Sequence, residues 1–358
     1  VNVPVTSTES TINFTGEGID LFSSPANQGG FGQTEPYLGA YGYGQQWEDE
    51  GVGINGALGN GVKVAVIDWS AHLEARTNDA NLDVGGQHAE LEHVILEGLD
   101  TGHDELHLVF DENIPFAYSA DHGSGILGII GAPWGPNSAP GIVLETRLEN
   151  NVGILGMVPD AELYFFPLVS IEDPTGREET AWLHALDTLG PGDVICAAYR
   201  PVVVDDSQPN LNYWDDTNTY LEVAKNLGIS TVIRAGNRGV DLSALEFEDQ
   251  HAIVAAAVSP GDPWKRWATG REPGPGGGGA SNYSTSIPID VSVVTASSWG
   301  MGVPTCGKGP RRDNYLGYNT IVYDDPTNTH SVHEYAYTNN FSGTSAAAAV
   351  VAGSVVML

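Results

Sequence analysis

Cysteine and basic residues are scarce in this sequence. Its 358 residues include 2 cysteines and 14 lysines and arginines, against 46 aspartates and glutamates. Two cysteines are too few for a disulfide framework, and the sequence leaves open whether Cys196 and Cys306 pair. The formal net charge of −32 excludes nucleic acid as a partner, because the two would repel each other. We interpret the acidic residues as a solvated surface, with a surface for a cationic partner as the alternative.

Long apolar runs are absent as well. The apolar segment at residues 346–358 is shorter than the about 20 residues of a membrane-spanning helix, so we expect no membrane span. The first residue is valine and no signal peptide is visible, which fits a mature, processed chain. We therefore expect a secreted or extracellular protein, including one attached to the cell surface.

Short apolar segments recur along the chain and alternate with helical patterns. Continuous apolar runs bounded by turn residues are typical of strands buried on both faces of a parallel sheet. They occupy residues 62–68, 163–169, 194–198, 230–236, 252–258 and 290–296. Helices are predicted over residues 123–131, 178–189, 219–227 and 346–358. This alternation predicts an α/β fold: a three-layer, doubly wound, mostly parallel sheet with helices on both faces.

The composition of the chain changes near residue 59. Residues 1–58 are polar with little periodicity, and we expect an extended arm or the remnant of a leader there. Residues 59–358 are predicted to form one domain. Its Gly-, Asp- and Pro-rich stretches, residues 71–120 and 299–338, are predicted to be loop insertions.

Two polar residues stand at places where active groups gather in such folds. Asp68 closes the apolar run VKVAVID, at a strand end. An isolated Asp there can equally be a helix cap or a turn residue. His122 lies in the segment DHGSGILGIIGA, whose glycines would let another backbone approach closely. A lone His at a helix start is more commonly a surface or capping residue.

Two further polar residues follow later in the chain. Asn237 ends an apolar run in RAGNRG, as a turn residue or as an amide directed into a site. Ser345 precedes an alanine-rich helix in SGTSAAAAVVAG. A serine there is commonly an N-cap. The alternative is a nucleophile at the positive end of a helix, where unpaired N–H groups would stabilise an oxyanion.

The order of these four residues is more informative than any one of them. It is the order Asp, His, Ser of the subtilisin type, with an amide donor before the nucleophile. The segments VAVID, HGSGILG, GILGMVPDAELY, AGNRG and SGTSAAAAVVAG resemble the Asp, His, middle, Asn and Ser blocks of the subtilisin-like serine proteases, or subtilases. The resemblance runs from about residue 58 to residue 358, and the chain ends inside the last helix, so we expect the domain to be C-terminally incomplete.

The resemblance implies a serine endopeptidase that hydrolyses peptide bonds in proteins. Ser345 would be the nucleophile, His122 the general base and Asp68 the residue that orients the imidazole. Asn237 would stabilise the oxyanion.

The same resemblance implies how protein or peptide substrates bind. An extended substrate would add as a strand beside Ala198, Tyr199 and Arg200 through main-chain hydrogen bonds. The Asp205–Asp206 pair just beyond would favour a basic substrate side chain, although solvated loop carboxylates are the more ordinary interpretation.

Several residues depart from the family's pattern. Trp69 and Ser70 follow Asp68 where the family has Thr-Gly, and Ala346 follows Ser345 where the family has Met. These departures motivate a second hypothesis, a catalytically silent subtilase fold kept as a binding or structural module. A lipase-like α/β-hydrolase does not fit, because it requires Gly-x-Ser-x-Gly and the order Ser, Asp, His.

No cofactor is expected for the chemistry itself. Subtilases often carry structural calcium, and the stretch from Asp79 through Asn81 and Asp83 to Glu90 has the oxygen-ligand spacing of a calcium loop. Val84 stands where that loop needs Gly, so chance spacing in an acidic chain is the competing interpretation.

Overall fold

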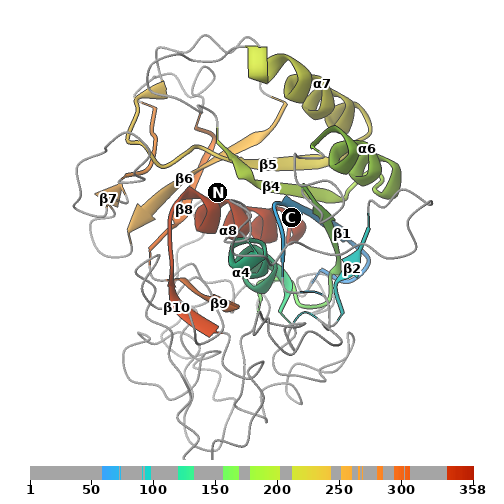
Figure 1. The fold of residues 1–358 in the computed structure, drawn as a ribbon, viewed down its shortest axis with the longest axis horizontal. Helices are drawn as coiled ribbons and strands as arrows, with labels where there is room; N and C mark the ends of the chain where they lie inside the picture. Colours follow the sequence, from blue (N-terminus) through green and yellow to red (C-terminus); the bar gives the residue numbers. More distant parts are fainter. Residues whose placement is uncertain are drawn as a thin grey trace, which may run out of the picture.

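Parallel strands form the centre of the fold in the computed structural model of the chain (Figure 1). It describes residues 59–71, 73, 91, 93–97, 120–132, 156–168, 178–201, 212–242, 251–259, 265–266, 268, 280–284, 294–301, 303–306 and 337–358. The main sheet has the order β2-β3-β1-β4-β5-β6-β7, with β8 paired to β6. Only β7 is antiparallel among the pairs described in this sheet.

The bounds of these strands are β1 Lys63–Asp68, β2 Ile95–Leu96, β3 Glu162–Pro167, β4 Val194–Pro201, β5 Ser230–Arg234, β6 Ile253–Ser259, β7 Lys265–Arg266 and β8 Ala296–Trp299. A separate antiparallel pair joins β9 Val303–Cys306 and β10 Tyr337–Phe341.

Strand β1 shows why the central strands are continuous apolar runs. Val64 and Val66 join one buried cluster, whereas Ala65 and Ile67 join another on the opposite face. Because successive side chains point to opposite faces, a strand covered on both sides needs apolar residues at every position.

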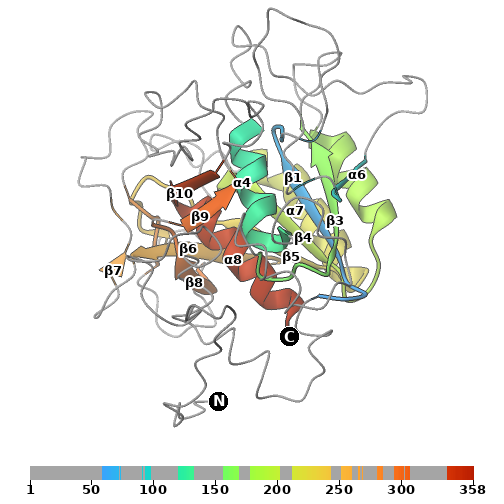
Figure 2. The ribbon, with the colours of Figure 1, turned by 90° about the horizontal axis from the view of Figure 1, so that it is seen from below.

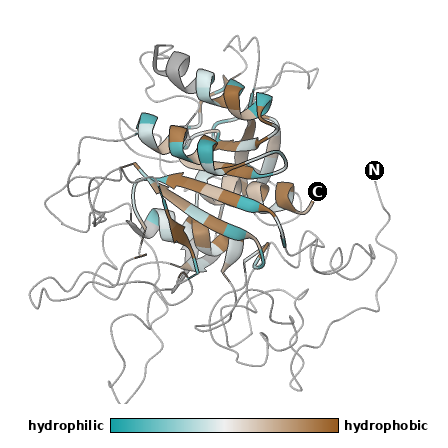
Figure 3. Ribbon diagram, turned by 90° about the vertical axis from the view of Figure 1, so that its right-hand side faces the viewer, coloured by the Kyte–Doolittle hydropathy of each residue, from teal (hydrophilic) through white to brown (hydrophobic). Residues whose placement is uncertain are grey.

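Helices cover both faces of the sheet (Figures 1 and 2). Helices α4 (Ala120–Gly131) and α8 (Thr344–Val356) pack on one face. Helices α6 (Glu178–Thr188) and α7 (Asn212–Asn226) pack on the other. The predicted three-layer α/β architecture is therefore confirmed, and the strands between the layers are largely hydrophobic (Figure 3).

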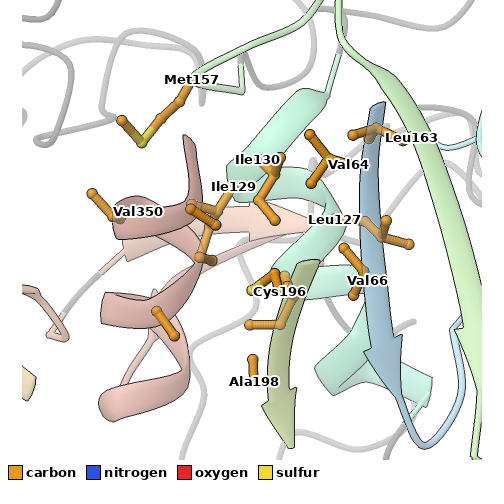
Figure 4. Close-up of a cluster of buried hydrophobic side chains, with 14 of the residues drawn as sticks. Val64, Val66, Leu127, Ile129, Ile130, Met157, Leu163, Cys196, Ala198 and Val350 are labelled. Carbon is orange, nitrogen blue, oxygen red and sulfur yellow. The ribbon is translucent and has the colours of Figure 1, made fainter. Parts of the chain in front are cut away.

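Helix α8 is buried on all of its sides. Every residue from Thr344 to Gly353 is buried, and the four alanines 346–349 have no exposed surface. Val350 faces the hydrophobic cluster that α4 and strands β1 and β4 share with α8 (Figure 4). The small side chains let the helix lie close to the sheet, as the alanine run predicts.

Helix α4 lies close to the end of β1, as α8 lies close to the sheet. A Cβ placed on Gly123 would lie 2.2 Å from the backbone oxygen of Ser70. Only glycine allows this approach, which brings the first turn of α4 against the segment that follows Asp68.

Three features of the fold differ from the sequence-based expectation. Of the predicted strand at residues 290–296, residues 290–293 lie outside the described residues, Val294 and Thr295 belong to no strand, and β8 begins at Ala296. Its sequence ASSW has two serines in the middle, so no continuous apolar run marks it. Helix α7 starts at Asn212 rather than at residue 219, with polar residues in its first turns. The predicted loop insertions contain β2 and β9.

Residues 1–58 lie outside the described residues, so the division into an arm and a domain stays a prediction. In the part of the chain that the structure describes, no helix has the length and apolar character needed to cross a membrane.

The contact between Gly123 and Ser70 yields a stability prediction. Gly123→Ala should lower the free energy of unfolding by about 1–3 kcal/mol, because α4 must move away from a rigid backbone atom. Urea-induced unfolding measures the change. Gly190→Ala is the matched control, because its Cβ would meet only an Asp193 oxygen at 3.9 Å. Equal losses in both variants would contradict the close approach of α4.

Candidate active site

Asp68 is a fully buried carboxylate at the carboxyl end of β1. Its Oδ1 accepts a hydrogen bond of 2.7 Å from the Trp69 backbone N–H. Its Oδ2 lies 2.6 Å from Nδ1 of His122. Burial of a charge is costly unless hydrogen bonds compensate it, and both oxygens of Asp68 have a donor.

His122 lies in the first turn of α4 and is 26% exposed. Because a carboxylate only accepts hydrogen bonds, the 2.6 Å contact requires a proton on Nδ1. In the neutral ring Nε2 is then the basic nitrogen. The ring also lies against Phe341, with 5.7 Å between the ring centroids. Phe341 ends β10 and immediately precedes the turn into α8.

Helices α4 and α8 start at the same end of the molecule. Near their starts, a Cβ on Gly125 would touch the Phe341 ring. Near their ends, Met157 connects them, because its N–H donates to Ile129 O and its side chain lies against Gly353. His122 and Ser345 therefore both stand at this shared starting end.

Ser345 is the second residue of α8, at its positive end. Its hydroxyl donates to the backbone oxygen of Ala198 at 3.2 Å and accepts from Nη1 of Arg234 at 3.1 Å. No hydrogen bond joins it to His122 in this structure. The N-cap position belongs to Gly343, which has no side chain that could cap the helix. The alternative that Ser345 is a plain N-cap is therefore wrong.

Asn237 is fixed to the start of α8 through its side-chain oxygen. Its Oδ1 accepts from the Thr344 backbone N–H at 2.8 Å and from the Thr344 hydroxyl at 2.7 Å. The Thr344 hydroxyl in turn accepts from Gly236 N–H at 3.1 Å. With its oxygen held in this way, the amide keeps its two N–H donors for another acceptor.

The turn before Ser345 also depends on Asn237. Gly343 has φ 104°, and a Cβ on it would lie 3.0 Å from Nδ2 of Asn237. The Asn237 backbone oxygen accepts from Ala280 N–H, so Asn237 is a turn residue as well as a side-chain contact to α8.

The stretch predicted to bind substrate lies where β4 and β5 separate. Their register shifts between the pairs Ala197–Ile233 and Pro201–Arg234. Within this gap the backbone oxygens of Ala198 and Tyr199 accept from side chains instead, from the Ser345 hydroxyl and from Nη2 of Arg234 at 2.7 Å. Arg200 belongs to β4, and its side chain lies outside the described residues. Substrate binding at residues 198–200 stays a prediction.

Arg234 is a site residue that the sequence-based reasoning missed. It ends β5, and burial lowers the pKa of its guanidinium to about 10, against an opposing effect of the Asp68 charge. It therefore remains a cation at neutral pH. In the sequence, the feature that could have pointed to Arg234 is a basic residue inside the apolar run STVIRAG, at the end of a strand.

Metal binding has no support in the described part of the chain, where no group of three or more His, Cys, Asp or Glu side chains could hold an ion. The predicted calcium stretch, with Asp79, Asn81, Asp83 and Glu90, lies outside the described residues. So do Asp205 and Asp206.

Comparison with known proteins identifies the family. The sequence model of the subtilase family of peptidases matches residues 59–358, so the chain belongs to the subtilase family. Membership in this family of peptidases supports a serine peptidase activity. It is similar to the structure of "Prenylagaramide maturation protease PagA", with 14% identity, a TM-score of 0.45, and coverage of 88% of this chain and 79% of that chain. No curated protein matches the chain.

The bonds between Thr344 and Asn237 yield a second prediction. Thr344→Val should lower the free energy of unfolding by about 1–3 kcal/mol, because the buried Gly236 N–H loses its acceptor and Asn237 loses a donor. Urea-induced unfolding measures the loss. Thr344→Ser keeps the hydroxyl and should lose clearly less. If the two variants unfold alike, the hydroxyl does not hold the two segments together.

Proposed function

We propose that this subtilase is a serine endopeptidase that uses Ser345, His122 and Asp68 as a catalytic triad. The observation that carries the proposal is the 2.6 Å hydrogen bond between Asp68 and His122. It joins the end of β1 to the start of a helix that lies beside α8, where Ser345 stands.

The proposed reaction is acyl transfer from a peptide to Ser345 and then to water. Ser345 Oγ attacks the peptide carbonyl, and Nε2 of His122 takes the hydroxyl proton and later delivers it to the leaving amine. Asp68 holds the proton-bearing Nδ1 and stabilises the imidazolium. Because the Ser345 hydroxyl now donates to Ala198, it must turn to His122 before attack; such hydrogen bonds often form only with substrate bound.

Asn237 is proposed as the oxyanion donor, together with the Ser345 backbone N–H. Support comes from the fixed carboxamide, whose Oδ1 is held by two donors of Thr344. A preorganised amide costs no reorganisation when negative charge develops on the carbonyl oxygen.

The proposed substrates are extended segments of proteins or peptides that pair with β4 at residues 198–200. Substrate N–H groups would pair with the Ala198 and Tyr199 oxygens, because a carbonyl oxygen can accept a second hydrogen bond beside those from Ser345 and Arg234. We propose that the chemistry needs no cofactor, that calcium has a structural role in the loops, and that the protein acts outside the cell.

The second candidate function is a catalytically silent module. The specific observation in its favour is that the Ser345 hydroxyl contacts Ala198 and Arg234 instead of His122. An active nucleophile reacts with a fluorophosphonate, whereas the serine of a silent scaffold does not, so labelling separates the two functions.

The nucleophile assignment leads to a direct prediction. The purified protein should be labelled by a fluorophosphonate at Ser345, as found by mass spectrometry of the modified peptide. Ser345→Ala should abolish both labelling and hydrolysis of a casein substrate, with an unchanged far-UV circular dichroism spectrum. Ser354→Ala, a change on the same helix, should stay labelled at Ser345. Residual hydrolysis by Ser345→Ala at the wild-type rate would refute the assignment.

The assignment of Asn237 as the oxyanion donor leads to another prediction. Asn237→Ala should lower kcat by about 10²–10³-fold with little change in KM, because the amide acts mainly on the transition state. Steady-state kinetics on one peptide measures both constants, and a thermal melt shows whether the variant is folded. An effect confined to KM would make Asn237 a substrate contact or a turn residue only.

A further inference from the structure

Arg234 is a cation inside the candidate active site without an anionic partner in the described part of the chain. Its two terminal nitrogens donate to uncharged oxygens, Nη1 to the Ser345 hydroxyl and Nη2 to the backbone oxygen of Tyr199. Its Nε is buried and has no hydrogen-bond partner. The residue as a whole remains partly exposed.

The acidic group whose charge acts on Arg234 does not neutralise this cation by contact. Asp68 raises the pKa of Arg234 through its charge, but its oxygens already accept from Trp69 and His122. Arg234 is partly exposed, and the charge of Asp68 offsets part of the cost of its desolvation, but no carboxylate among the described residues contacts the guanidinium. Because no described carboxylate contacts this guanidinium beside the proposed nucleophile, its terminal nitrogens can bind an anion of a ligand.

The guanidinium is held in a defined position. The Tyr199 hydroxyl accepts from Trp182 Nε1 at 3.0 Å and donates to Glu178 Oε1 at 2.8 Å, which anchors Tyr199 to α6. Its backbone oxygen then fixes Nη2 of Arg234 at 2.7 Å. A planar, preorganised guanidinium is the group that best matches the two oxygens of a carboxylate.

We propose that Arg234 determines specificity by binding a substrate carboxylate next to the scissile bond. The inference rests on the proposed function, because Ser345 must be the atom that attacks. Nη1 lies 3.1 Å from Ser345 Oγ, so an anion on this nitrogen lies within one side-chain length of the attacked carbonyl. The carboxylate comes from an Asp or Glu on the residue that supplies this carbonyl, or from the substrate's C-terminus just beyond it.

Binding of a carboxylate also changes the state of the nucleophile. A charge-assisted bond from Nη1 to the carboxylate is stronger than the bond from Nη1 to a neutral hydroxyl. The carboxylate therefore displaces Ser345 Oγ from Arg234 and leaves it available to His122. A substrate of the favoured class thus removes one of the two contacts that now hold the hydroxyl away from the base.

The test compares peptides that differ at one residue. Peptides with Asp or Asn before the cleaved bond, and a second pair with Glu or Gln, are matched in size but differ in charge. Wild-type kcat/KM should be about 10–100-fold higher for the acidic member, the range of a hydrogen bond to a charged group. A third pair with a free or amidated C-terminus one residue after the bond tests the second source of the carboxylate.

Arg234→Gln should bring the acid-to-amide ratio of kcat/KM close to one, whereas Arg234→Lys should retain part of it. The ratio is read within each variant, so a general loss of activity does not affect it. Absence of any preference for a carboxylate in the wild type would overturn the proposal. So would an Arg234→Gln variant that slows all peptides equally and keeps the ratio, because Arg234 would then act on the reaction itself.

Fluorophosphonate labelling separates this proposal from the proposed function. If Ser345 is labelled and peptides are cleaved without regard to charge, only the role of Arg234 fails. If neither labelling nor cleavage of any peptide occurs in the wild type, the endopeptidase function fails and the role of Arg234 fails with it.

Discussion

The burial of α8 over residues 344–353 is the constraint on which the rest of the structure depends. A helix surrounded by β4, β5, β6, β8 and α4 has no solvent-facing side, so its side chains must be small or apolar throughout. The alanines 346–349 meet this requirement with little loss of rotamer entropy and with good helix propensity. Close packing then fixes the start of the helix, and with it Ser345, against the carboxyl ends of the strands.

The site is assembled from three neighbouring strands and two helices. Asp68 ends β1, the Ala198 oxygen belongs to β4, and Arg234 ends β5, three strands that are adjacent in the order β1-β4-β5. Polar groups at such strand ends escape the apolar environment of the strand interior. The interruption between β4 and β5 adds backbone oxygens that the sheet does not use. Ser345 and Arg234 each donate a hydrogen bond to one of these oxygens.

Much of this arrangement is predictable from sequence. The same physical reasons explain which elements and contacts the sequence does not predict. The strands β1, β3, β4, β5 and β6 are buried on both faces and therefore appear as apolar runs. Strand β8 has the sequence ASSW and is no continuous apolar run, so the predicted strand at residues 290–296 overlaps it only at Ala296. The contact between Asp68 and His122 follows from ordered sequence blocks. The contact of Arg234 with Ser345 does not, because it depends on how α8 packs against the end of β5, which no local pattern encodes.

The state of the two cysteines decides whether folding of the chain depends on the redox potential of its surroundings. Cys196 and Cys306 are both buried thiols, and burial, with a smaller effect of Asp68, raises the pKa of Cys196. A protonated, inaccessible thiol neither exchanges with glutathione nor oxidises readily. As no other cysteine exists in the sequence, the fold does not depend on the redox potential of its surroundings. The described fold is therefore held by packing and hydrogen bonds and not by a disulfide.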